Sequence, residues 1–233
     1  MARRYYCNPL PPAGPATLSP NLGHHLGRVV RTAPGDAVVL FDGAGAEAAA
    51  TVLEVEGRDV RVEVGARLAQ PLGRSPRVHL EVAVALPKNP RADWLFEHGT
   101  EVGIATFRPI LTERTNRQHE RRPHWQRILV AACAQCDRAV LPVIEATVPL
   151  AELGAMPLPA ERYVATASAT ELGPAVGDAC LLVVGPEGGL AAHEVERLVA
   201  AGFAPRSLGP LTLRTETAVF AGAVRLLQAP FRR

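Results

Sequence analysis

The sequence predicts an α/β protein of two domains, with a small β domain first and a larger domain built on a mainly parallel sheet after it. Short β-type runs separated by turn residues crowd residues 37–64, and apolar strands alternate with amphipathic helices in the rest of the chain. A stretch rich in proline, glycine and serine, AQPLGRSP at residues 69–76, separates the two patterns. We therefore expect domains at residues 1–72 and 73–233.

The first domain is expected to be a small β-barrel or meander. After a proline-rich start, three short β-type runs follow one another, AVVLF, AAATVLEV and DVRVEV, joined by the turn signals DGAG and EGRD. The segment GAGAEA at residues 43–48 fits the dinucleotide-binding spelling G-x-G-x-x-A. Because that fingerprint requires a helix after it, and a further β run follows here, we interpret the segment as a hairpin turn.

The second domain alternates strands and helices. Strands are expected at residues 78–86, 106–112, 162–167 and 180–185, with short extended pieces at 142–146 and 207–209, and helices at 90–103, 123–137, 191–202 and 215–228. This alternation indicates a mainly parallel sheet that helices cover on both faces. Ligands in such sheets bind beyond the carboxyl ends of the strands, so residues that follow strands are the first candidates for a site.

The composition indicates a soluble, cytoplasmic protein with reduced cysteines. No apolar run approaches the ~20 residues that span a bilayer, and the arginines near the N-terminus lack the apolar segment of a secretory signal. The pair Cys133 and Cys136 lies inside an expected helix without a second ligand pair, and HEVER at residues 193–197 lacks the second histidine of a zinc motif. We therefore expect no metal site and no membrane segment.

Positive charge is distributed unevenly, although the formal net charge is only +2. Residues 1–40 carry four arginines against one acidic residue, and residues 108–138 carry seven arginines against three acidic residues. Such segments are candidate anion-facing patches. Solvated arginine faces explain part of the same pattern, because charged side chains usually lie on the surface whatever the function.

Two glycine-containing loops near the C-terminus carry the strongest functional signal. In LLVVGPEGGL, residues 181–190, an apolar strand runs into three glycines, which let backbone groups approach a ligand without an intervening Cβ. In LGPLTLRTETAVFAGAV, which starts at Leu208, a Gly-Pro turn leads to Arg214 and then to a helix capped by Thr215 or Thr217. A tight turn explains either loop alone, whereas two such loops after successive strands indicate a binding site.

The last expected helix carries a group of small residues, Ala218, Ala221, Gly222 and Ala223. A glycine inside a helix costs about 1 kcal/mol relative to alanine unless something packs closely against it. Tight contact within the fold and contact across a dimer explain this pattern equally well.

The two loops together carry a family resemblance. VGPEGGL, followed further along the chain by SLGPLTLRTETAV, resembles the paired C-terminal signature of the RsmE family of 16S ribosomal RNA uridine-N3 methyltransferases. The resemblance extends through ALPKNPRADWLFEHGTEVGI, LTERT and WQRILVAACAQCDRAVLPVI, and into the first domain through HHLGRVVR and GDAVVLFDGAG. It covers nearly the whole chain.

The resemblance implies a PUA-like RNA-binding β-barrel as the first domain and a SPOUT α/β domain with a deep trefoil knot as the second. It also implies that S-adenosylmethionine binds to the knot loops and that the protein forms a homodimer through the C-terminal domain. The implied substrate is 16S ribosomal RNA, within an assembled small ribosomal subunit. Carried over by position, the cofactor-binding residues are Thr166, Val184, Gly185, Glu187, Gly188, Gly189, Leu208, Gly209, Leu211 and Leu213.

Methyl transfer to the imide nitrogen N3 requires its proton to leave, so a cation close to the carbonyl oxygens of the base would stabilise the deprotonated form. Arg214 is the first candidate for this role, and Arg138 with Gln135 is the second. Glu187, Glu216 and solvent are alternatives for the proton acceptor. The residues expected to contact RNA are Arg3, Arg4, His24, His25, Arg28, Arg31, Arg114 and Arg117.

Three other functions stay open at this point. The same fold and cofactor could serve a ribose 2′-hydroxyl or a transfer RNA base. A non-catalytic RNA-binding factor of ribosome assembly would leave the two glycine-containing loops unexplained. A nucleotide-dependent oxidoreductase disagrees with the missing helix after residues 43–48.

Overall fold

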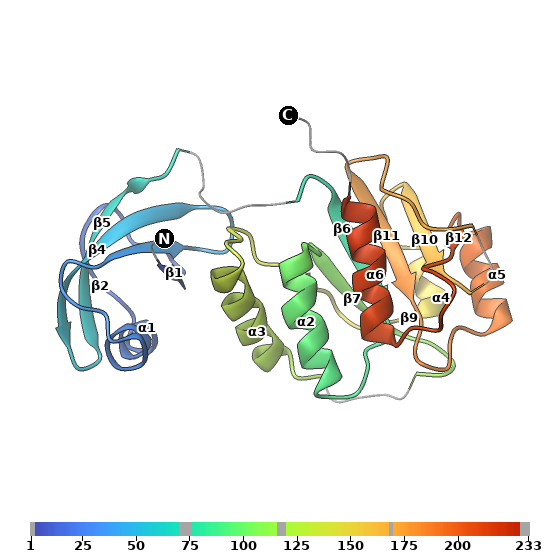
Figure 1. Ribbon diagram of the computed structural model, residues 1–233, viewed down its shortest axis with the longest axis horizontal. Helices are drawn as coiled ribbons and strands as arrows, with labels where there is room; N and C mark the ends of the chain where they lie inside the picture. Colours follow the sequence, from blue (N-terminus) through green and yellow to red (C-terminus); the bar gives the residue numbers. More distant parts are fainter. Residues whose placement is uncertain (1–2, 70–75, 116–119, 168–169, 229–233) are drawn as a thin grey trace. The chain divides into compact units, whose positions relative to one another are not determined.

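The structure is a computed structural model that describes residues 3–69, 76–115, 120–167 and 170–228 (Figure 1). By contacts between Cα atoms the chain divides into two compact units, Met1–Ser75 with Val130–Leu141, and Pro76–Leu129 with Pro142–Arg233. The stretch Val130–Leu141 thus clusters with the first unit, although a linear boundary near residue 73 places it in the second domain.

The first unit contains a five-stranded, mainly antiparallel sheet. Its strands are β1 (Arg3–Tyr6), β2 (Gly14–Thr17), β3 (Ala37–Phe41), β4 (Glu47–Glu56) and β5 (Asp59–Arg67), in the order β1-β3-β4-β5-β2. Strand β1 runs parallel to β3, and the other neighbours are antiparallel. Alternate apolar residues such as Val52, Val60 and Val62 fill the core of this unit. The three expected β runs are confirmed as β3, β4 and β5.

A short helical segment between β2 and β3 packs against the turn that joins β4 and β5. It consists of α1 (Pro20–His24) and the π-helical turn η1 (His25–Val30). A Cβ atom on Gly23 would lie 2.0 Å from the carbonyl oxygen of Arg58, and one on Gly27 would lie 2.9 Å from that of Gly57. Glycine at these two positions therefore permits the close backbone approach.

The second unit is built on a parallel sheet (Figure 1). Its strands are β6 (His79–Val84), β7 (Thr106–Leu111), β8 (Val143–Ile144), β9 (Val148–Pro149), β10 (Glu161–Ala165), β11 (Ala179–Val184) and β12 (Ala204–Arg206). Six of them follow the order β12-β10-β11-β6-β7-β8, and β9 pairs with β7. Every strand pairing of this sheet in the described part of the chain is parallel, as the alternation of strands and helices predicts.

Helices cover both faces of the parallel sheet. They are α2 (Arg91–Val102), α3 (Arg122–Gln135), α4 (Leu150–Leu153), α5 (Ala192–Ala200) and α6 (Thr215–Leu227). Along β11, Leu182 and Val184 join an apolar cluster with residues of α2 and α6, while Leu181 and Val183 join a cluster with residues of α4 and α5. Helices α2 and α6 lie side by side on one face (Figure 1).

Six short elements are absent from the sequence prediction: β1, β2, α1 and η1 in the first unit, and β9 and α4 in the second. Strand β12 begins three residues before the expected piece at 207–209. Among the described residues, no helix is both long and apolar enough to cross a membrane. Nor do the described His, Cys, Asp and Glu side chains form a group of three that could hold a metal ion.

Candidate functional site

Three loops meet at the carboxyl ends of neighbouring strands in the second unit. Strands β12, β10 and β11 are adjacent and parallel, so the segments that follow Arg206, Ala165 and Val184 emerge at the same edge of the sheet. These segments line a cavity of about 190 Å³. Parallel sheets bind their ligands at this edge, which makes the cavity the first candidate for a ligand site.

The cavity brings together most of the residues that the sequence assigns to the cofactor. Eight of the ten line it: Thr166, Val184, Gly185, Gly189, Leu208, Gly209, Leu211 and Leu213. Glu187 and Gly188 belong to the same loop but are not lining residues. Sequence reasoning did not assign eight further lining residues to the cofactor, namely Ala165, Ala167, Pro186, Leu190, Pro210, Thr212, Thr215 and Ala218. Six of these lie inside the two glycine-containing motifs, which is the signal that could have identified them.

Residues 185–189, called the glycine loop below, form a turn that requires glycine at two positions. A Cβ atom on Gly185 would lie 2.9 Å from Cγ of Leu190. Gly189 has a φ of +70°, in the left-handed region that favours glycine. Thr215 Oγ1 donates a hydrogen bond to the carbonyl oxygen of Gly185 at 3.1 Å. The start of α6 therefore holds the beginning of the glycine loop.

The cavity has an apolar wall and one unsatisfied hydroxyl group. Leu208, Leu211 and Leu213 supply the apolar wall, and Gly209 between them has a φ of +137°. Thr166 donates its backbone N–H to the carbonyl oxygen of Arg206 at 2.9 Å, yet its side-chain Oγ1 is buried without a hydrogen-bond partner. Buried hydroxyls are normally hydrogen-bonded. The arrangement suits an organic ligand that combines an aromatic ring with polar groups.

Arg214 immediately precedes α6, and its side chain is exposed. Its backbone carbonyl oxygen accepts a hydrogen bond from the Ala218 N–H at 2.8 Å, so this residue begins the regular helix. The next residue, Thr215, lines the cavity. Arg214 thus places a guanidinium group next to a cavity-lining residue, where it is accessible to a substrate.

The second candidate pair for catalysis lies in the first unit. Arg138 is 6% exposed, and burial lowers the pKa of its guanidinium group while the nearby thiols of Cys133 and Cys136 act in the opposite direction. Gln135 is exposed at the end of α3. Cys133 is buried and Cys136 half-buried, both as free thiols, and burial raises the pKa of Cys133 to about 12.

The candidate RNA-contacting residues of the first unit differ in exposure. Those with exposed side chains are Arg3, His24, His25, Arg28 and Arg31. Arg4 is only 7% exposed, because its guanidinium group pairs with the buried Glu47 carboxylate and donates to the carbonyl oxygen of Arg138 at 3.2 Å. Arg4 therefore belongs to the interior of the first unit, and its burial argues against the predicted contact with RNA.

Arg3 and Arg31 line a second cavity of about 360 Å³, together with Tyr5 and Asp36 among other residues. Arg31 has a φ of 56°, which is uncommon for a residue other than glycine. The Tyr5 hydroxyl is buried without a hydrogen-bond partner, and the Asp36 carboxylate accepts the Ala33 N–H at 2.9 Å. Two guanidinium groups against one carboxylate leave this cavity with a net positive charge.

The arginine candidates of the second unit have different outcomes. Arg114 is exposed, and its Nη1 donates to the carbonyl oxygen of Gly188 at 2.7 Å, so it holds the glycine loop. Arg117 lies outside the described residues.

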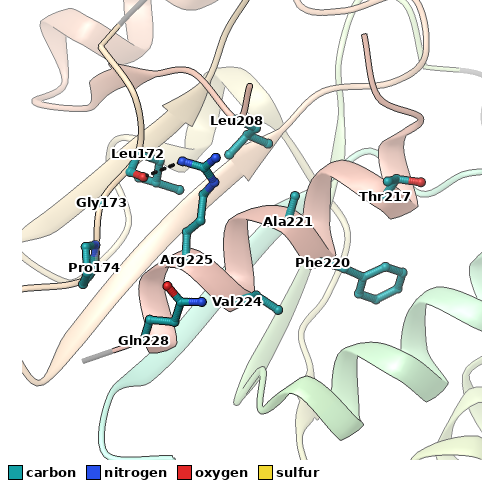
Figure 2. A pocket seen from close by; sticks show the side chains of 10 residues that line it. All are labelled: Leu172, Gly173, Pro174, Leu208, Thr217, Phe220, Ala221, Val224, Arg225 and Gln228. Atoms are coloured by element: carbon teal, nitrogen blue, oxygen red, sulfur yellow. Dashed lines mark hydrogen bonds between the residues drawn. The ribbon is translucent and has the colours of Figure 1, made fainter. Parts of the chain in front are cut away.

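An open groove runs along α6 (Figure 2). It has a volume of about 590 Å³ and is lined by Leu172, Gly173, Pro174, Leu208, Thr217, Phe220, Ala221, Val224, Arg225 and Gln228. The five residues from α6 recur at helical spacing and so share one face of the helix, and Gln228 follows directly after its end. Figure 2 shows Arg225 reaching from this face to the carbonyl oxygen of Leu172, at 3.1 Å. This face of α6 is therefore left partly uncovered by the second unit.

Most of the small residues of α6 pack inside the second unit instead of lining the groove. A Cβ atom on Gly222 would lie 2.3 Å from Cδ2 of Leu182 in β11. Ala218 and Ala223 are buried as well, and Ala221 lines the groove. Of the two explanations that the sequence leaves open for Gly222, contact within the fold therefore applies.

Family models match both units of the chain. A model for an RNA methyltransferase domain matches residues 74–227, and a model for an RNA methyltransferase PUA domain matches residues 18–65. The parallel-sheet unit therefore corresponds to the methyltransferase domain, and most of the antiparallel sheet to the PUA domain.

Individual relatives resemble the chain over nearly its whole length. Ribosomal RNA small subunit methyltransferase E of Mycobacterium bovis is 32% identical, with 97% of this chain and 92% of that protein covered. A Legionella pneumophila methyltransferase solved with bound S-adenosylmethionine has a TM-score of 0.85 and 27% identity, covering 96% of each chain. Ribosomal RNA small subunit methyltransferase E of Neisseria gonorrhoeae, also bound to S-adenosylmethionine, has a TM-score of 0.88 and 25% identity, covering 96% of this chain and 95% of that one.

Proposed function

Because the chain belongs to the ribosomal RNA small subunit methyltransferase E family, we propose that it transfers a methyl group from S-adenosylmethionine to N3 of a specific uridine in 16S ribosomal RNA. One observation carries this proposal: eight residues that the sequence assigns to the cofactor line one cavity at the carboxyl edge of the parallel sheet. In this proposal residues 1–72 position the RNA, and residues 73–233 bind the cofactor and perform the transfer.

The residues of the cavity fit S-adenosylmethionine, which supplies an electrophilic methyl group on a positively charged sulfur. Leu208, Leu211 and Leu213 offer an apolar wall to an adenine ring. The partnerless Thr166 hydroxyl and the backbone groups of the glycine loop offer hydrogen bonds to the polar parts of the cofactor. Because Thr215 holds the beginning of the glycine loop through a contact within the fold, less ordering is required on binding.

Arg214 serves the acceptor base in this mechanism. The N3 nitrogen of uridine becomes nucleophilic when it loses its proton, and the resulting negative charge spreads over the two neighbouring carbonyl oxygens. An exposed guanidinium group next to the cavity stabilises this charge where it develops. Its planar fork can also donate hydrogen bonds to one carbonyl oxygen of the base and to a neighbouring acceptor. These bonds would orient the base for in-line attack.

Calorimetry tests the cofactor assignment. We expect saturable binding of S-adenosylmethionine and none of NAD or ATP, because neither phosphate-binding fingerprint is present in its required context. Saturable NAD binding without heat from S-adenosylmethionine would contradict the proposal.

Nucleoside mass mapping of 16S ribosomal RNA after reaction tests the acceptor. We expect a single N3-methyluridine. A methylated ribose 2′-hydroxyl, or a modified transfer RNA base with unmodified 16S RNA, would support the other acceptors. Because the proposed substrate lies within the assembled small subunit, subunits and free RNA are compared in the same assay.

The exposed basic residues of the first unit support the RNA-positioning role. Arg3 and Arg31 converge on a positively charged cavity, and Arg28 is exposed on η1. Phosphate contacts release counterions, so RNA affinity falls with salt. The triple substitution of these arginines by alanine should weaken RNA binding and flatten its salt dependence, with unchanged affinity for S-adenosylmethionine. If the dependence of RNA affinity on salt concentration were unchanged, these arginines of the first unit would not contact RNA phosphates.

A second copy of the chain is the proposed occupant of the groove along α6. Seven of the ten residues that line the groove are apolar or small, and Leu208 lines both the groove and the cofactor cavity. We expect Val224→Asp to convert a dimer into a monomer in sedimentation. Val199→Asp on α5 is a matched control, because the two valines are 44% and 45% exposed. A wild-type monomer at all concentrations would contradict the proposal.

Family membership supports two further parts of the proposal. The loops around Thr166, Gly185 and Leu208 belong to a deep trefoil knot of the SPOUT type, and the enzyme works in the cytoplasm, where its ribosomal substrate is assembled.

A further inference from the structure

The glycine loop contains one polar side chain, that of Glu187, because its other four residues are glycine and proline. Glu187 Oε1 lies 2.8 Å from Nη1 of Arg91, at the beginning of α2. The same Nη1 lies 4.0 Å from Oε1 of Glu216, in the first turn of α6. One guanidinium group therefore links three segments of the second unit: the start of α2, the glycine loop and the start of α6.

The two carboxylates around Arg91 have different surroundings. Glu187 is exposed, whereas Glu216 is 5% exposed and its Oε2 is buried without a hydrogen-bond partner. A buried carboxylate without a cation close to it is strongly unfavourable. Glu216 therefore favours a position of the Arg91 guanidinium group next to it. Arg91 is thus held from the interior by Glu216, and it presents a fixed guanidinium group to the exposed Glu187.

Other contacts hold the backbone of the glycine loop. Thr215 Oγ1 donates to the carbonyl oxygen of Gly185, and Arg114 Nη1 donates to that of Gly188. These bonds act on two carbonyl groups, whereas Arg91 acts on the side chain in the middle of the loop. Arg91 does not itself line the cofactor cavity, although Gly185, Gly189 and Thr215 do.

We propose that Arg91 is a positioning residue for methyl transfer. By holding Glu187 and Glu216 together it fixes the glycine loop against the start of α6, and so sets the shape of the cofactor cavity before the cofactor binds. A preformed cavity binds its ligand more tightly because less ordering accompanies binding. This inference rests on the proposed function, since it assigns Arg91 to the same cofactor site.

Calorimetric titration of S-adenosylmethionine and S-adenosylhomocysteine into the full-length protein tests the inference. Glu187→Gln removes the negative charge from the loop contact but leaves the Arg91 and Glu216 pair intact, so it does not endanger the fold. Arg91→Lys keeps the charge but loses the guanidinium group, whose Nη1 lies near both carboxylates. We expect each variant to bind both ligands about 5-fold or more weakly, a typical size for coupling between groups that do not share a contact with the ligand.

The control is Arg61→Gln, which removes a comparable exposed pair with Glu54 at 3.1 Å in the first unit. It should leave both affinities unchanged. The two ligands share every group except the methyl and the positive charge on sulfur, so a positioning role lowers both affinities by the same factor.

Three results decide the inference. Wild-type affinity in both Glu187→Gln and Arg91→Lys would overturn it while leaving the proposed function in place. A loss confined to S-adenosylmethionine would also overturn it, because that pattern indicates direct attraction between the carboxylate and the sulfonium charge. A wild-type protein that binds neither ligand would overturn the proposed function itself and this inference with it.

Discussion

Substitution of Gly23 by alanine should destabilise the first unit and weaken RNA binding. The new Cβ atom would lie 2.0 Å from the carbonyl oxygen of Arg58, well inside the 3.0 Å below which Cβ atoms are essentially never found. A backbone oxygen in the β4–β5 turn cannot rotate away as a side chain can. The helical segment therefore has to move outward as a body, and it carries the exposed His24, His25 and Arg28 with it.

The magnitude follows from two opposing effects. Alanine is favoured over glycine in a helix by about 1 kcal/mol. Overpacking costs about 1–3 kcal/mol, and the upper end applies where the obstructing atom belongs to the backbone. A net loss of about 2 kcal/mol in the free energy of unfolding corresponds to a fall of roughly 10 °C in the melting temperature of a domain of this size.

Two probes separate the units in this experiment. Both tryptophans, Trp94 and Trp125, belong to the second unit, so tryptophan fluorescence reports on that unit alone. Hydrogen exchange followed by mass spectrometry reports on β4 and β5. We expect Gly23→Ala to lower amide protection in those strands and to reduce RNA affinity, while the fluorescence transition and the affinity for S-adenosylmethionine stay unchanged.

The control for the substitution itself is Gly177→Ala, where the heavy atom nearest to an added Cβ atom would be Oε2 of Glu161 at 3.4 Å, an ordinary van der Waals contact. This variant should retain wild-type stability. The reasoning is refuted if Gly23→Ala keeps wild-type amide protection in β4 and β5, because the 2.0 Å approach would then not constrain the first unit.

Four further predictions concern the second unit and α3. Arg214→Ala should lower the single-turnover methylation rate about 100-fold under saturating conditions, with Arg214→Lys intermediate; an unchanged rate would exclude the assigned role. Gly222→Leu should lower the urea midpoint through its clash with Leu182; an effect on dimerisation alone would contradict this. Thr166→Val should weaken cofactor binding about 5-fold by calorimetry, the value of one hydrogen bond; an unchanged affinity would show that the hydroxyl does not contact the cofactor. Cys133, with a pKa raised to about 12, stays protonated and should resist alkylation up to pH 9 in the native protein; rapid native labelling would disagree.

The cofactor cavity could be predicted from the sequence because its signals are local. Strand β11 is a continuous apolar run buried on both faces, and three glycines follow it directly. The second loop is marked in the same way by Gly209 before α6. Since both loops follow strands that are parallel within one sheet, β11 and β12 on either side of β10, the sequence pattern was sufficient to place them at one edge of the sheet. Two lining residues outside the motifs, Ala165 and Ala167, carry no local signal of their own.

The role of Arg91 could not be predicted in this way. Its contacts with Glu187 and Glu216 join residues that are far apart in the sequence and meet only because β6, β11 and α6 lie next to one another in the fold. In the sequence Arg91 is one of many arginines, and it lies at the beginning of an expected helix. The pair of Arg91 and Glu216 is important because the Glu216 carboxylate is buried. This burial depends on how α6 packs, which cannot be predicted from a local sequence pattern.

The fate of Arg3 and Arg4 shows most directly why charge alone does not identify an RNA-binding residue. The two arginines are adjacent in β1, so the alternation of the strand sends their side chains to opposite faces. Arg3 reaches a cavity where it joins Arg31, whereas Arg4 points inward to Glu47, the first residue of β4. Which of the two is buried depends on the pairing of β1 with β3, and a register one residue away would exchange their roles. Removal of Arg3 is therefore expected to change affinity for RNA, while removal of Arg4 would take away the guanidinium group that pairs with the buried Glu47 carboxylate and change stability first.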